Sequence, residues 1–353
     1  MSFASLKHFS QVKDYVVLFG VLLGAGIVYR RMEDKRLRDT TASDYSLIRK
    51  YLSGGTGNNI DGFPDLRGDR PIMWIHVPRQ KNARNWVNFG SRTSLDLNQP
   101  YLRLTIKSIV AASGNSFTIC LIDDASFKQL MPAWGVDMTK LTGPVLDNVR
   151  QLGMAKLLYE YGGIICPHSF VCLKNLLPLY LDGIGANRDQ MFACNFIAHT
   201  TSAATTMAPS LQFCGATAKN ARVGALIQFL ELTISTDSTA ASVFNAAPSK
   251  WLTLGPQNIA KVRIIEGTSI GTQSGDLREI RLDDLLSNHY LDLAPDAYGI
   301  YIPAAELLKR HKYEWFARLS EKQVLESNTI LGNYLLLACE QYYQEHLIND
   351  VTE

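Results

Sequence analysis

The chain has 353 residues, of which 46% are hydrophobic and 19% are charged, and 35 basic against 33 acidic side chains leave a formal charge of +2. This composition excludes intrinsic disorder, collagen and low-complexity scaffolds, which have fewer apolar residues or a strict Gly and Pro bias. The near-neutral charge argues against a general nucleic-acid binder.

The first element along the chain, which follows a short N-terminal segment (1–14), is an apolar segment at residues 15–30 that is uncharged up to its last residue, Arg30. Its core, YVVLFGVLLGAGIVY, would span about 22 Å as a helix, which is shorter than the ~30 Å hydrocarbon core of a bilayer. Lys13 and Arg30 can snorkel to the interfaces and make up the difference. A cleaved signal peptide and a buried core helix are the alternatives. The basic flank RRMEDKRLR favours a retained, single transmembrane helix.

Two features of this segment predict its surroundings. Gly20 and Gly24 have the small-xxx-small spacing that lets a second helix approach closely, so we expect other transmembrane subunits as partners in addition to membrane lipid. More Lys and Arg follow the segment than precede it, which places the large domain on the cytosolic or matrix side. The first fourteen residues contain no Arg, unlike a cleavable mitochondrial transit peptide. An uncleaved anchor in the inner mitochondrial membrane is favoured, with ER/Golgi or viral membranes as alternatives.

The rest of the chain is predicted to be one α/β domain. A charged helix and a Gly/Asn-rich linker (31–67) precede it, the domain covers 68–345, and a tail follows (346–353). IMWIHVP and FTICLIDD are strand candidates on either side of a helical stretch, PYLRLTIKSIVAAS, that ends near Gly114, and together they form a βαβ unit. Further strands are expected at GGIIC, MFACNF and VRIIEG, with helices around 146–161, 219–233 and 304–346.

The six cysteines lie mostly within apolar runs such as FTICLID and NYLLLACE. They are too few for a disulfide framework and lack zinc-site spacing, so we expect buried thiols.

The most informative stretch is DNVRQLGMAKLLYEYGGIICPHSFVCLKNL (147–176), in which a helix ends in a Tyr-rich turn at Gly162 and Gly163 and a short strand follows. This layout resembles glycosyltransferase family 32 and the capsular-polysaccharide-synthesis group. In these proteins a helix reading S-D-x-x-R…L-Y-x-Y-G-G leads into a strand that ends in D-x-D. The resemblance extends over residues 70 to 270, with IMWIHVP similar to the opening strand and WLTLGPQNI similar to a T-G-P segment. It implies a GT-A-like nucleotide-diphospho-sugar transferase fold.

The sequence departs from the family pattern where the chemistry is expected. Pro167 and Ser169 stand at the two D-x-D positions, with His168 between them, and the helical Asp and Arg fall at Gln151 and Met154. The family's carboxylates hold a divalent ion that neutralises the diphosphate leaving group. Proline offers no side-chain oxygen and serine is a poor ligand for a hard ion. We therefore expect a degenerate site that holds no metal or other cofactor.

Other residues are candidates for a residual ligand site. Asp123 and Asp124 follow a strand at the edge where α/β sheets bind ligands, although the favoured interpretation is that they cap a helix starting near Ala125. Arg84 lies in a basic, aromatic loop, KNARNWVNFGSR, which either holds a phosphate or acidic lipid headgroup or packs its aromatics on the domain. His168 lacks partners at ligand spacing and is expected to be a surface or satisfied core residue.

The glycine pair, Gly162 and Gly163, has two interpretations: it lets the backbone approach a phosphate, or it only stops the helix.

Two principal hypotheses follow. The first is a membrane-anchored, catalytically inactive glycosyltransferase-like protein that serves as a structural subunit of a membrane complex. The alternative is an active, metal-independent glycosyltransferase that uses basic residues on a nucleotide sugar, with Mn or Mg returning only through other residues. A viral membrane or capsid-associated protein with the same fold is a third hypothesis, since fold alone does not decide function.

Overall fold

The computed structural model describes residues 68–77, 100–131, 133–141, 143–198, 206–236, 241–255, 262–309 and 311–339, all within one compact unit. The predicted span with Gly20 and Gly24, the 31–67 segment, the loop that contains Arg84 and the 346–353 tail lie outside these ranges. Within the described ranges, no helix combines the length and the hydropathy needed to cross a bilayer.

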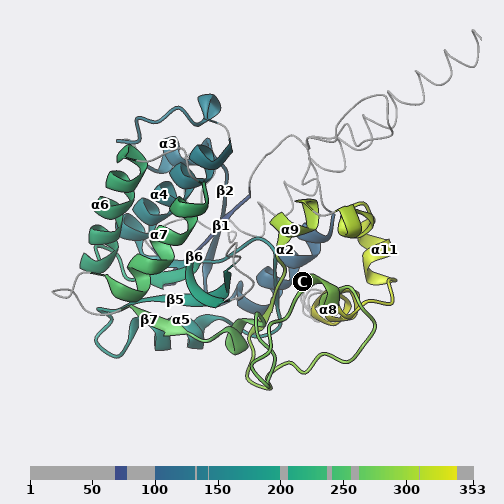
Figure 1. The fold of residues 1–353 in the computed structure, drawn as a ribbon. Helices are drawn as coiled ribbons and strands as arrows, with labels where there is room; N and C mark the ends of the chain where they lie inside the picture. The colour runs from purple at the N-terminus through teal and green to yellow at the C-terminus, as the bar shows by residue number, and fades with distance from the viewer. Residues whose placement is uncertain are drawn as a thin grey trace, which may run out of the picture. The chain divides into compact units, whose positions relative to one another are not determined.

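A six-stranded mixed sheet forms the centre of the unit, with strand order β2–β1–β3–β6–β5–β7 (Figure 1). Its parallel pairs are β1 with β2, β1 with β3 and β5 with β7, whereas β6 is antiparallel to both of its neighbours. The strand bounds are β1 Ile72–His76, β2 Thr118–Ile122, β3 Gly163–Ile165, β5 Met191–Ala198, β6 Thr206–Ala216 and β7 Arg263–Ile265. The predicted α/β class and all five predicted strands are confirmed.

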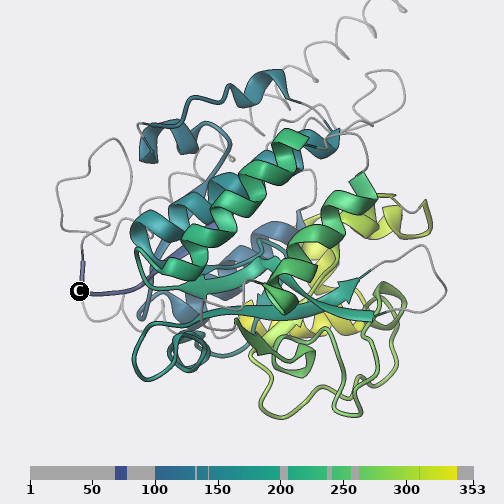
Figure 2. The same ribbon diagram turned by 60° about the vertical axis from the view of Figure 1, so that its left-hand side comes forward.

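Helices cover both faces of this sheet. The predicted helix before β2 is α2 (Tyr101–Ser113), which lies on one face, and α4 (Gly143–Tyr161), α6 (Ala221–Thr236) and α7 (Ala241–Leu254) lie on the other (Figures 1 and 2). Side chains alternate along β1 accordingly. Ile72 and Trp74 belong to the core cluster that includes α4 and α6, whereas Met73 and Ile75 are fully buried toward the opposite face.

The glycine pair after α4 stops the helix and allows a close approach of two strands. Gly162 and Gly163 have φ values of 70° and 100°, which L side chains rarely adopt. A Cβ atom on Gly163 would lie 2.0 Å from the carbonyl oxygen of Ile72 in β1. The Trp74 indole donates to the Gly162 carbonyl at 2.9 Å. Both glycines are therefore needed where α4 turns into β3, as the helix-stop interpretation predicts.

The region that follows β7 is more broken than predicted. A long helical region was expected over 304–346, but the structure has α9 (Ala304–Lys309), η3 (His311–Tyr313), α10 (Glu314–Ala317), α11 (Glu321–Leu325) and a helix over 330–339. That prediction is wrong because local signals restart the helix: Ser320 and Gln323 form a capping box at α11.

The remaining elements are short. Strands β4 (Phe170–Cys172) and β8 (Gly299–Tyr301) form a separate antiparallel pair. The short helices are α3 (Ser126–Leu130), η1 (Met138–Lys140), α5 (Leu177–Ile184), η2 (Gly267–Ile270) and α8 (Leu282–Leu285). All six cysteines are buried and unbridged, as predicted.

Candidate functional site at the carboxyl ends of the parallel strands

The sheet order places a ligand-binding edge beside β1. Strand β1 has β2 on one side and β3 on the other, and both follow it in the sequence. The order of the strands therefore reverses at β1. Open α/β sheets bind ligands in the crevice outside the carboxyl ends of such strands. Here these ends carry His76, the pair Asp123 and Asp124, and the segment 166–169.

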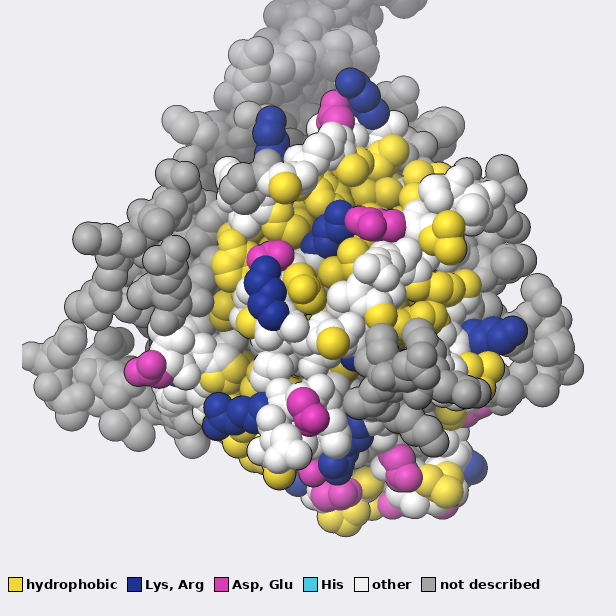
Figure 3. Space-filling model, turned by 90° about the vertical axis from the view of Figure 1, so that its left-hand side faces the viewer, with side chains coloured by type: hydrophobic (Ala, Val, Ile, Leu, Met, Phe, Trp, Pro, Cys, Tyr) yellow, Lys and Arg dark blue, Asp and Glu magenta, His cyan; other side chains and the backbone are white. Residues whose placement is uncertain are grey.

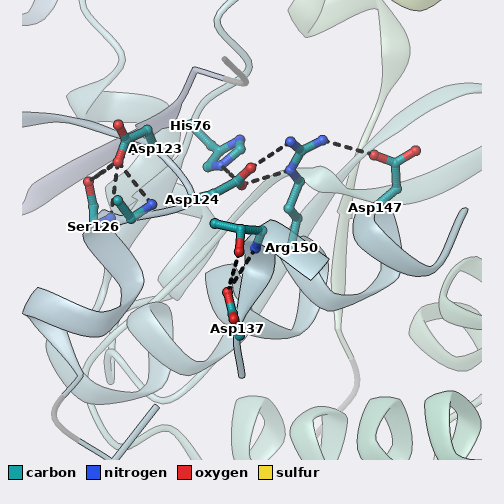
Figure 4. A network of polar contacts seen from close by, with 9 residues as sticks. His76, Asp123, Asp124, Ser126, Asp137, Asp147 and Arg150 are labelled. Atoms are coloured by element: carbon teal, nitrogen blue, oxygen red, sulfur yellow. Dashed lines mark hydrogen bonds and ion pairs between the residues drawn. The ribbon is translucent and has the colours of Figure 1, made fainter. Parts of the chain in front are cut away.

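Asp124 is the centre of a polar network in which both of its oxygens are occupied (Figure 4). Oδ1 lies 3.0 Å from His76 Nε2 and accepts from Arg150 Nε at 2.8 Å, and Oδ2 accepts from Arg150 Nη2 at 2.7 Å. Arg150 also donates to Asp147 at 3.2 Å. Burial alone would raise the pKa of Asp124, but the hydrogen bonds and charges of Arg150 and His76 outweigh it and hold that pKa well below its usual range.

Asp123 has a different, local role. Its Oδ1 accepts from the backbone N–H groups of Ala125 and Ser126 at 3.1 and 3.0 Å, and from the Ser126 hydroxyl at 2.8 Å (Figure 4). These bonds satisfy donors at the entry to α3, which confirms the capping interpretation for Asp123. The capping interpretation does not hold for Asp124, whose carboxylate points toward His76 and Arg150 instead.

The segment after β3 is built into the fold. Burial and, after it, the neighbouring charge of His76 lower the pKa of His168 from 6.5 to about 4, and a hydrogen bond to the main chain of His76 offsets this only in part. His168 is therefore neutral at pH 7. Its carbonyl accepts from Thr105 Oγ1 of α2 at 2.6 Å. The interpretation of His168 as a satisfied core residue is the one that these contacts support.

The two positions that flank His168 carry no carboxylate. Ser169 is buried, and its hydroxyl hydrogen-bonds Tyr301 of β8, which in turn donates to Gln212 of β6 at 3.1 Å. Pro167 lies at the turn between β3 and β4. Across the described ranges, no group of three or more His, Cys, Asp or Glu side chains is arranged to hold a metal ion.

Three residues of this network were not predicted from the sequence: His76, Asp147 and Arg150. The helical Asp and Arg of the family motif were matched to Gln151 and Met154, but Met154 is buried in the core. Asp147 and Arg150 have the same D-x-x-R spacing four residues earlier, which is close to one turn of α4. The sequence DNVR (147–150) therefore already contained the pattern that identifies Asp147 and Arg150.

Chemically, the network is an Arg between two carboxylates with a histidine at its edge. Because Arg150 donates to both Asp124 and Asp147, its charge is balanced within the protein. His76 stacks on Phe127 with ring centroids 5.6 Å apart and holds one ring nitrogen against Asp124. A carboxylate-oriented imidazole is also the arrangement of a general base.

Comparisons with known proteins add little to this geometry. No protein-family description and no curated protein sequence matches the chain. Among solved structures, it is similar to one named PaToxG Glycosyltransferase, with 11% sequence identity, a TM-score of 0.29, and coverage of 62% of this chain and 78% of that chain. At this TM-score, the fold has to be argued from the strand order of this protein and its function from its own site.

Proposed function

We propose that the chain is a membrane-anchored, catalytically inactive glycosyltransferase-like protein with a GT-A-like fold, which serves as a structural subunit of a membrane complex. One observation carries the proposal: the residues at the ligand edge are engaged by the fold itself. Asp123 caps α3, and Asp124 is paired with Arg150 and His76. After β3, the positions of the family carboxylates hold Pro167 and Ser169.

The chemistry of sugar transfer explains why this matters. As the sugar–phosphate bond breaks, charge develops on a diphosphate, and a divalent ion or fixed cations must stabilise it. Such an ion needs carboxylate oxygens that are not already committed. The oxygens of Asp124 accept from Arg150, and His168 is uncharged at pH 7. The edge therefore offers little to a nucleotide diphosphate.

An apolar outer face supports the role as a subunit. Figure 3 shows hydrophobic side chains between adjoining basic and acidic ones on the side of the molecule where α6 and α7 lie. Leu232 of α6 is 63% exposed, next to a Glu231 that pairs with Lys156 of α4. Lys156 also lies over the ring of Trp134, near the exposed Val136. Extended apolar surface of this kind is typical of protein interfaces.

The membrane part of the proposal rests on the sequence. The segment at 15–30 would anchor the chain, the basic flank would keep the domain on the cytosolic or matrix side, and Gly20 and Gly24 would pack on a partner helix. The inner mitochondrial membrane remains the favoured location. Replacing both glycines with Leu should preserve insertion but weaken co-purification of partners from mild detergent, and normal assembly would contradict the subunit role.

A metal-independent glycosyltransferase is the second candidate, favoured by the His76–Asp124 pair. A histidine oriented by a carboxylate at the ligand edge can act as a general base toward an acceptor hydroxyl. Arg150 is the cation that contacts this pair. In this alternative, Arg150 would release Asp147 or Asp124 when a nucleotide sugar binds.

Ligand-induced stabilisation separates the two. A ligand that binds only the native state raises its stability by several kcal/mol at saturating excess. We expect the melting temperature of the purified full-length protein to remain unchanged with a panel of nucleotide sugars, with Mn²⁺ or with EDTA. A clear rise with one nucleotide sugar in EDTA would favour the metal-independent enzyme, and a rise that requires Mn²⁺ would refute both the degenerate site and its alternative.

A further inference from the structure

We draw no further inference here: the strongest candidate, the apolar outer surface of α6 and α7 with its exposed Leu232 and Leu254, carries nothing beyond the interface already proposed, because nothing in the structure shows what covers it.

Discussion

At the scale of single residues, Arg150 is the side chain on which the ligand edge depends most. It donates three hydrogen bonds to Asp124 and Asp147. Replacing it with Met would leave Asp124 half-buried without its main partner, and we expect a loss of about 2 kcal/mol in the free energy of unfolding. Lys140→Met, which breaks the exposed pair with Asp137, should leave the free energy of unfolding nearly unchanged. Urea unfolding compares the two, and equal costs would show that the Arg150 network adds no stability.

His168 predicts a dependence of stability on pH. Because its pKa is lowered from 6.5 to about 4 in the folded state, the unfolded protein takes up its proton first as the pH falls. The stability that follows from keeping His168 neutral is present above about pH 6.5 and is lost progressively toward pH 4, by about 2 kcal/mol at pH 5. Asp124, whose pKa is lowered from 3.8, loses its contribution only at lower pH.

The test for His168 is urea unfolding at pH 7 and pH 5. The variant His168→Asn should lose much less stability between these two values than the wild type does. A wild-type protein that is equally stable at both values would contradict a neutral, half-buried His168.

At the scale of elements, the junction between α4 and β3 is the most constrained part of the sheet. Gly163→Ala would place a Cβ atom 2.0 Å from the Ile72 carbonyl at a φ of 100°, so we expect destabilisation by about 3 kcal/mol or more. Gly135→Ala, where no atom lies within 4 Å of the added Cβ, should be nearly neutral. Thermal unfolding of both variants checks this. A mild effect at Gly163 would mean that β3 can move away from β1.

The elements also show what the sequence can and cannot predict. Strands β1, β2 and β5 are short, continuous apolar runs, and such runs predict buried strands directly. β6 was missed because TMAPSLQFCGA contains Pro209, Gly215 and polar residues. The pairing of Asp124 with Arg150 joins residues 26 apart and exists only once α4 has packed across the sheet. No local sequence pattern predicts this pairing, although the D-x-x-R spacing of Asp147 and Arg150 points to Arg150 as one of its two members.

At the scale of the whole molecule, the outer face near α6 should matter for assembly rather than for folding. Leu232→Glu changes an exposed side chain, so the melting temperature should shift little, whereas co-purification of partners from native membranes should fall. Leu277→Glu, equally exposed but in the 271–281 segment, is the control. Loss of partners in both variants, or in neither, would remove this face from the proposed interface.

The central claim is that the ligand edge no longer supports sugar transfer, and turnover tests it most directly. The full-length protein in detergent would be incubated with radiolabelled nucleotide sugars, with Mn²⁺ or EDTA, and both hydrolysis and transfer would be followed alongside the variant His76→Ala. The account predicts no release of sugar above the level without protein, and no difference between wild type and variant. Sugar release by the wild type that His76→Ala abolishes would contradict it.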